Sequence, residues 1–535
     1  MRASHLTLVA ALVVCAHLST ANAGQYEIEA RPIGPDAEDT ARLTELALRT
    51  PRVRSALNGI KHRVLATEVG IASDPRKNAE GDQLALQVYD YTNDKLLTIT
   101  APMEELDRAE IASGEDQLVP TYDEFAEAVR ILEEDSAFGP ALKKGDLVPY
   151  QAMPALLDPK ATTGKRVIPV GLRPTKANLT HEIVAVDMRA GRIERFTQNA
   201  PPGAIATAAT CGPQSARQRT TRQGTRGMAE VSVKKDGVVL WKMKVVRASA
   251  SSGRWGSGVE LRDVQYKGTS VLARAHVPIL NVNYEGDICG PFRDQVNEEN
   301  AYVATGRRIT TGIQRVSTLP QTIFDTKVDR GNYWGVSLYE NDAEFIVMSE
   351  LSAGWYRYVS EYRFLADGTI KPYFRFSSVH NSCTCRAHVH HLYWRFDFDI
   401  AGKTPNSVAY QKADDTWSPV ATEEKQMRDA NHKAWRVFNP TTKTGYEILP
   451  GPSDGTANEF GKGDVWVLKY AKNQLDDGRL GGGSDKYIKI DSWVNNEPVD
   501  ATDIVFWYGG HLPHANDATD PPQIVGPTLK PFIMQ

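Results

Sequence analysis

Residues Cys383 to Gly402 read CTCRAHVHHLYWRFDFDIAG, and this stretch contains two histidines separated by a single residue. Residues two apart on an extended strand point to the same side. His388 and His390 can therefore present two imidazoles to one metal ion while Val389 packs the other way. This arrangement is typical of a copper or zinc site that lacks only a third ligand. The alternative is that these histidines are ordinary surface or packing residues.

The length and the net charge of the chain limit the classes of protein to which it can belong. The chain has 535 residues, which gives room for about two to four domains and a large core. Its 62 basic and 66 acidic side chains leave a formal net charge of -4. That balance gives no sign of nucleic-acid binding or of a polybasic membrane surface. We therefore expect no nucleic-acid partner, and the other partners have to be inferred from the sites.

The first residues have the three parts of a secretory signal. A charged Arg2 is followed by an apolar run from Leu6 to Leu18 and then by Ala21-Asn22-Ala23, which predicts a signal peptide over residues 1–23. The run is too short to cross a membrane as a helix, and no later segment is as apolar over the length of a span. We expect a secreted or periplasmic protein without a membrane span.

Four cysteines follow the predicted signal, at Cys211, Cys289, Cys383 and Cys385. An even number in an exported chain predicts one or two disulfide bonds, whose pairing the sequence leaves open. An alternative for the C-x-C pair just before the histidines is Cu(I) binding by two thiolates.

The chain divides into two small mixed segments and one long β-rich segment. Residues 24–112 and 113–200 each show a helical period followed by alternating strands, which predicts two small α+β domains. Thr121 and Glu124 form a capping-box start for the helix of the second domain. Residues 201–228 have little periodicity and are interpreted as a linker. Strands with Gly and Pro turns dominate residues 229–535, which predicts a large antiparallel β-sandwich in the segment that contains the candidate metal-binding histidines.

The order of residues after the histidine pair resembles a known family. H-x-H, four residues and then Arg395, Asp397 and Asp399 in R-x-D-x-D is similar to the metal strand of the copper-containing amine oxidases. The resemblance implies Cu(II) on His388 and His390, and two small α+β domains before a β-sandwich.

A second segment near the C-terminus supplies further expected ligands by the same resemblance. Asp503-Ile504-Val505-Phe506-Trp507, leading to His511-Leu512-Pro513, is similar to the family segment that carries the third copper ligand, which implies His511. His391 and His514 are then expected not to bind the metal. Asp500 lies eleven residues before His511, so Asp397, Asp399 and Asp500 are expected to hold a hard cation such as calcium.

The family builds its quinone cofactor from a tyrosine in a T-x-x-N-Y-[DE] motif. The similar run here is Ser352-Ala353-Gly354-Trp355-Tyr356-Arg357, which implies topaquinone derived from Tyr356. Trp355 and Arg357 replace the neighbours found in the family. We expect Arg357 to place a permanent positive charge near the tyrosine ring and to repel a protonated amine.

Two more catalytic positions are implied by resemblance. Val282-Asn283-Tyr284-Glu285-Gly286-Asp287 is similar to the family's V-P-Y-G-D element, so Tyr284 is expected to hydrogen-bond the cofactor. The family's base lies about fourteen residues later, and the same spacing here reaches Glu298. Asp329, in Asp329-Arg330-Gly331-Asn332-Tyr333, is similar to the motif of the family's base but does not lie at its spacing, and it is the alternative candidate.

These expectations define a secreted oxidase that depends on copper and a quinone. It would convert a primary amine to an aldehyde, consuming O₂ and releasing hydrogen peroxide and ammonia. The family resemblance implies a homodimer. Two other hypotheses remain: a mononuclear copper oxidase or oxygenase with Tyr356 unmodified, and a copper-binding protein without catalysis.

Overall fold

The computed structural model describes residues 26–534 except for 36, 71–82, 115–117, 119, 152–164, 177, 180–181, 196–221, 224–226, 253–257, 284–291, 294–297, 380–383, 385–386, 477–487 and 515–522. The predicted signal peptide, Tyr284, the four later cysteines and most of the predicted linker lie outside the described residues. No helix within the described ranges is long and apolar enough to cross a membrane.

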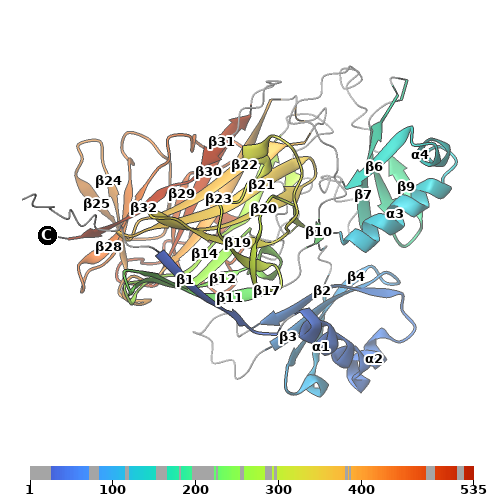
Figure 1. Ribbon diagram of the computed structural model, residues 1–535, viewed down its shortest axis with the longest axis horizontal. Helices are drawn as coiled ribbons and strands as arrows, with labels where there is room; N and C mark the ends of the chain where they lie inside the picture. Colours follow the sequence, from blue (N-terminus) through green and yellow to red (C-terminus); the bar gives the residue numbers. More distant parts are fainter. Residues whose placement is uncertain are drawn as a thin grey trace, which may run out of the picture.

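Two small domains, each with helices packed on a four-stranded antiparallel sheet, lie beside a larger β-structure (Figure 1). The first contains α1 (Ala37–Arg49), α2 (Pro51–Leu57), β2 (His62–Gly70), β3 (Gln83–Asp90), β4 (Lys95–Pro102) and β5 (Glu110–Gly114). The second contains α3 (Tyr122–Glu134), α4 (Gly139–Lys143), β6 (Leu147–Gln151), β7 (Val167–Pro174), β8 (Glu182–Asp187) and β9 (Arg192–Arg195). The capping box of Thr121 and Glu124 is present at the start of α3.

A buried polar network joins the two small domains. The Arg166 guanidinium donates to Glu124 from Nε at 2.8 Å and from Nη2 at 2.7 Å, and Tyr91 of the first domain donates to the same carboxylate at 2.6 Å. Arg166 and Glu124 are both buried. Both members of this ion pair belong to the second domain, and the hydroxyl of Tyr91 connects the first domain to it.

The large β-structure consists of two packed sheets. Among the described residues one sheet has the order β1-β11-β12-β13-β14-β23-β30-β29-β26, with β15 on β14. Its strands are β1 (Tyr26–Ile33), β11 (Met228–Lys235), β12 (Val238–Val246), β13 (Glu260–Tyr266), β14 (Thr269–Asn283), β15 (Phe292–Arg293), β23 (His388–Phe398), β26 (Glu424–Gln426), β29 (Val465–Lys469) and β30 (Ile504–His514).

The second sheet has the order β17-β18-β19-β20-β21-β22-β32-β28-β27-β24-β25, with β10, β16 and β31 off this path. Its strands are β10 (Arg222–Gln223), β16 (Glu298–Glu299), β17 (Gly306–Thr310), β18 (Ile313–Val316), β19 (Val336–Glu340), β20 (Glu344–Ala353), β21 (Tyr356–Leu365), β22 (Ile370–Ser378), β24 (Ser407–Gln411), β25 (Trp417–Val420), β27 (Trp435–Asn439), β28 (Thr444–Leu449), β31 (Gln523–Val525) and β32 (Thr528–Ile533). All pairs are antiparallel except β18 with β19.

The predicted fold class is therefore confirmed, with one difference at the N-terminus. Strand β1 lies within the range predicted for the first small domain, but it pairs with β11 at the edge of the sandwich. Its alternate residues Tyr26 and Ile28 are buried in the sandwich core. A short alternating strand fits the edge of any half-buried sheet. The sequence alone therefore did not distinguish the sheet of the first small domain from the edge of the sandwich.

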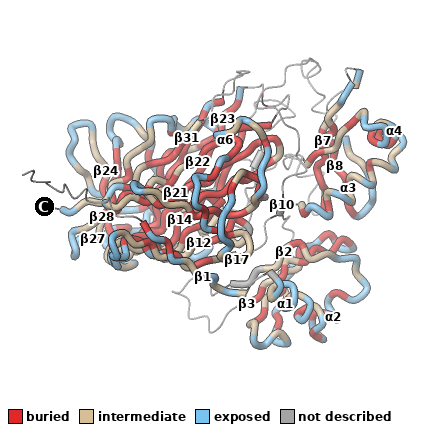
Figure 2. Tube along the Cα trace, viewed as in Figure 1, coloured by how far each residue is buried: buried red, intermediate tan, exposed pale blue. Residues whose placement is uncertain are grey.

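The core between the two sheets is aromatic at the level of β21 and β23. Figure 2 shows these central strands as largely buried. Inward residues of both sheets share one hydrophobic cluster there: Trp355, Tyr356, Tyr358, Phe374, Phe376, Trp394 and Phe396. Strands β21 and β23 belong to different sheets, so side chains from the two can meet across the sandwich.

Candidate metal centre and active site

The pairing of β23 with β30 decides which histidines meet. His388 lies opposite His514, His390 opposite Leu512, and His391 opposite His511. Directly opposed residues of an antiparallel pair share a face, and consecutive residues alternate between faces. His388, His390 and His514 therefore point into the sandwich, while His391 and His511 point to the reverse face.

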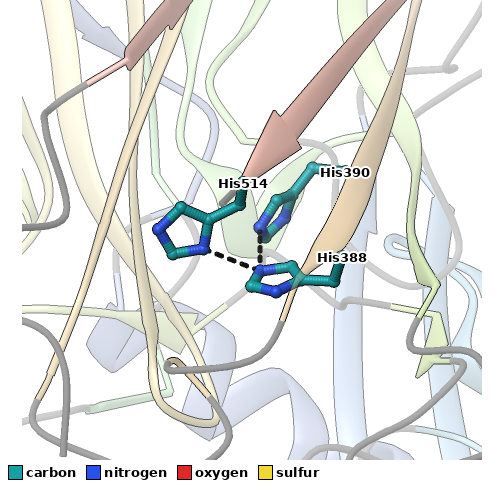
Figure 3. A group of neighbouring side chains, drawn as sticks. All are labelled: His388, His390 and His514. Carbon is teal, nitrogen blue, oxygen red and sulfur yellow. Dashed lines mark hydrogen bonds between the residues drawn. The ribbon is translucent and has the colours of Figure 1, made fainter. Parts of the chain in front are cut away.

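Three buried imidazoles converge at the inner end of these strands (Figure 3). Nε2 of His388 lies 3.0 Å from Nε2 of His390 and 2.9 Å from Nδ1 of His514. Burial, followed by the neighbouring imidazoles, holds the pKa of His390 well below its usual range. A neutral ring keeps a lone pair available for a metal ion, so this group has the donors that a copper site requires.

The third histidine of the cluster is His514, and the assignment of His511 from the sequence is wrong. His511 lies three residues before His514, and an odd displacement along a strand places a side chain on the opposite face. The expectation that His514 would not belong to the cluster is wrong for the same reason. A signal in the sequence was available, because His514 follows Asp503 by eleven residues, as His511 follows Asp500.

The carboxylates show the same shift of three residues. Asp397, Asp399 and Asp503 bring one oxygen each to within 4.8 Å of one another. Asp500, the residue expected from the sequence, is exposed and accepts a hydrogen bond from Ser407 Oγ at 2.6 Å instead. Three converging carboxylates are suited to a hard cation.

Tyr356 reaches the histidine cluster from the opposite sheet. It is the first residue of β21, is fully buried, and its Oη lies 2.5 Å from Nε2 of His388. The tyrosine ring packs edge-on against His390, with ring centroids 4.6 Å apart. Sequence reasoning missed Tyr358, whose Oη lies 3.1 Å from Nδ1 of His390. Its spacing of two residues from Tyr356 on a strand was the signal.

Arg357 does not act as expected from the sequence. It follows Tyr356 on β21 and points to the reverse face, where its Nη2 and Nε lie 3.0 and 3.2 Å from the carboxylate oxygens of Asp329. Its Nη1 donates to Ser352 Oγ at 3.0 Å. The positive charge is therefore paired behind the strand rather than placed beside the tyrosine ring.

The same contacts bear on the two candidates for the catalytic base. Asp329 is buried behind β21 and also accepts from Asn300 Nδ2 at 2.6 Å, so it faces away from the ring of Tyr356 and is removed as a candidate. Glu298 lies in β16, with its backbone opposite Ser352 of β20. Its side chain is outside what the structure describes, and its role stays a prediction.

Trp355 occupies the turn between β20 and β21 and yet is fully buried. Tyr150 of β6 packs against it in an edge-on contact, with ring centroids 6.4 Å apart. The second small domain therefore covers the turn next to Tyr356. A side chain added at Gly171 would collide with the ring of Tyr150, so glycine there allows this contact.

Glu350 belongs to the same buried hydrogen-bond network behind β21 as Asn300 and Asp329. It is fully buried and accepts from Asn300 Nδ2 at 2.5 Å, and burial raises its pKa from 4.5 to about 8. The folded state therefore holds a proton that the unfolded state releases, so the stability contributed is complete below about pH 4.5 and is lost as the pH rises toward about 8.

We expect the free energy of unfolding to fall over this window by up to about 1.4 kcal/mol per pH unit. Glu350→Gln should remove that part of the slope, as measured by urea unfolding at several pH values. An identical pH dependence of the wild type and the variant would show that folding does not raise the pKa of Glu350.

Comparison with known proteins agrees with the geometry. Residues 374–532 match the family model for the copper amine oxidase enzyme domain. No curated protein matches the chain.

Several solved structures share the fold at low sequence identity. A copper-containing benzylamine oxidase from Hansenula polymorpha is 14% identical, with a TM-score of 0.52 over 95% of this chain and 93% of that chain. The lysyl oxidase of Pichia pastoris is 13% identical, with a TM-score of 0.57 over 94% and 89%. The Aspergillus nidulans amine oxidase is 13% identical, with a TM-score of 0.53 over 94% and 88%.

The matched enzyme domain contains the histidine pair, and the fold extends over nearly the whole chain. The family match therefore covers residues 374–532, as the sequence resemblance predicted, and the solved amine oxidases share the fold of the chain.

Proposed function

We propose that this protein is a copper- and quinone-dependent amine oxidase. In the net reaction a primary amine, O₂ and water give an aldehyde, ammonia and hydrogen peroxide, so the amine carbon is oxidised and O₂ is reduced by two electrons. The observation that supports this proposal is the meeting of Tyr356 with His388, His390 and His514 in one buried cluster.

The residues present fit the cofactors that the family implies. Three buried imidazoles are a suitable donor set for Cu(II), and Tyr356 lies against them as the quinone precursor. Copper there would supply electron exchange with O₂, and a quinone from Tyr356 would supply a carbonyl that reacts with the amine. Tyr358 would accept a hydrogen bond from Nδ1 of His390, which leaves the lone pair on Nε2 directed at the cluster.

The remaining residues bind, orient and exclude water. Glu298 is proposed as the base that takes the α-proton of the amine, and Tyr284 as a hydrogen-bond partner of the cofactor. Burial of Trp355 under Tyr150 closes one side of Tyr356 to solvent, which protects a reactive carbonyl from side reactions. We also propose that the protein is exported and acts as a homodimer.

One observation favours the second candidate, a copper oxidase or oxygenase with Tyr356 unmodified. Trp355 is fully buried, with its ring centroid 6.2 Å from that of Tyr356, which leaves an amine little room to approach the tyrosine from that side. The two candidates differ in whether Tyr356 is chemically changed.

Peroxide release tests the proposal directly. Copper-loaded protein should release hydrogen peroxide and ammonia in equal amounts when given benzylamine or a peptide bearing a lysine side chain, the kinds of amine named for two proteins of this fold. Metal-free protein is the control. Full copper loading without peroxide from any primary amine would exclude the amine oxidase and leave the second candidate.

We further propose that Asp397, Asp399 and Asp503 bind calcium. Asp503→Asn should weaken calcium binding by at least about tenfold, because it removes one of three anionic ligands. Asp500→Asn, a matched change three residues away on a carboxylate that faces Ser407, should bind calcium as the wild type does. Calorimetric titration of chelator-treated protein measures both, and the reverse order of affinities would exclude this site.

A further inference from the structure

The reverse face of the metal strands carries a row of buried polar side chains that the proposed reaction does not use. Asn281 of β14, His391 of β23 and His511 of β30 lie opposite one another across three adjacent strands. All three side chains are buried. Buried polar groups are usually hydrogen-bonded. The Asn281 amide and Nε2 of His391 have no hydrogen-bond partner among the described residues, whereas the facing nitrogens of His391 and His511 do.

A hydrogen-bonded chain runs from a carboxylate through both imidazoles. Nε2 of His511 lies 3.0 Å from Asp464 Oδ1 and 3.0 Å from the carbonyl oxygen of Gly463. Its Nδ1 lies 2.8 Å from Nδ1 of His391. Both partners of Nε2 are acceptors, so Nε2 carries the proton in a neutral His511. Its Nδ1 then accepts, and Nδ1 of His391 donates.

The end of this chain is fixed to the surrounding loop. Asp464 accepts backbone hydrogen bonds from Arg428 and from Ala457, each at 2.7 Å. Space around the rings is also defined, because a Cβ at Gly461 would lie 2.7 Å from Nδ1 of His391 and a Cβ at Gly509 would lie 2.8 Å from Nε2 of His511. Glycine at both positions leaves room for the two imidazole rings to form this hydrogen-bonded chain.

We infer that His391 and His511 are positioning residues for the metal centre. The bond between them joins β23 to β30 one rung from His390 and three rungs from the pair of His388 with His514. A slip of one residue between these strands would move His514 to the face away from His388 and His390. The reverse-face chain therefore adds a side-chain constraint to the backbone pairing of β23 with β30 and favours the register that brings the three inner imidazoles together.

This inference rests on the proposed copper centre, and a pair of matched substitutions tests it. His391→Leu keeps much of the ring volume and removes the donor. His391→Asn places an amide N–H near the position of Nδ1 and restores it. We expect the leucine variant to bind Cu(II) at least about tenfold more weakly than the wild type, in the range seen when supports of metal ligands are removed, with a changed Cu(II) paramagnetic resonance spectrum. The asparagine variant should retain the wild-type affinity and spectrum.

His511→Gln is the second variant and covers the case in which the leucine variant does not fold. Its amide nitrogen can still donate to Asp464, but the side chain has no acceptor at the position of Nδ1, so copper binding should weaken as in His391→Leu. Folding of each metal-free variant is checked by thermal unfolding, and His432→Leu, on a histidine that contacts Asp429, controls for loss of any histidine.

Wild-type affinity and spectrum in folded His391→Leu or His511→Gln protein would overturn the inference, since the chain would then be merely structural. Failure of the wild type itself to bind copper would instead refute the proposed function.

Discussion

His514→Ala should reduce Cu(II) affinity by at least about a hundredfold, because it removes one of the three nitrogen donors rather than a group that supports them. The bound-copper spectrum of any remaining complex should show coupling to the two imidazoles of His388 and His390. His511→Ala should show a smaller loss of affinity and coupling to three imidazoles, since His511 lies on the reverse face of the strand. Chelator competition and paramagnetic resonance measure the two quantities.

This comparison separates two assignments that differ by three residues. If His511→Ala lost a nitrogen donor and His514→Ala kept all three, the register of β23 and β30 described above would be wrong at its inner end. His432→Ala serves as the control, because His432 lies far along the chain from both strands and should bind copper as the wild type does.

Tyr356→Phe should retain copper within a few-fold but lose amine oxidation by about four orders of magnitude or more, the scale seen when a covalent catalytic group is removed. Phenylalanine keeps the ring packed against His390 and removes only the hydroxyl that lies 2.5 Å from His388. The loss of one buried hydrogen bond costs about 1 kcal/mol of stability, so the variant should fold. Peroxide release and copper content measure the two effects.

Tyr358→Phe is the matched control for Tyr356→Phe. Both tyrosines are buried and both hydroxyls contact a histidine of the cluster, but only Tyr356 is the proposed quinone precursor. Tyr358→Phe should keep measurable oxidase activity with weaker copper binding. Equal activity in the wild type and in Tyr356→Phe would show that this tyrosine is not the cofactor precursor.

The sequence predicted the fold and two of the three histidines of the metal cluster because those depend on local patterns. Alternation along a strand is enough to place His388 and His390 on one face. The identity of the third ligand depends on the register in which β30 pairs with β23. That register results from contacts between residues far apart in the chain, which the sequence alone does not reveal. The spacing of eleven residues was right, but its starting point should have been Asp503, not Asp500.

The neighbours of Tyr356 could not be interpreted from the sequence for a different reason. Arg357 and Asp329 are separated by 28 residues and meet on the far face of the sheet, so the charge near the ring depends on a contact that spacing alone does not show. Trp355 is covered by Tyr150, which lies in another domain. Long-range contacts of this kind decide whether an apparently disruptive residue is harmful or already compensated.

The most direct test of the central claim is to add Cu(II) and O₂ to copper-free protein and to follow the visible spectrum and the mass of the peptide that carries Tyr356. The account predicts a quinone absorption band and a mass increase on that peptide alone, both absent without O₂ and absent in Tyr356→Phe. A peptide that stays unmodified while copper binds fully to His388, His390 and His514 would contradict the account.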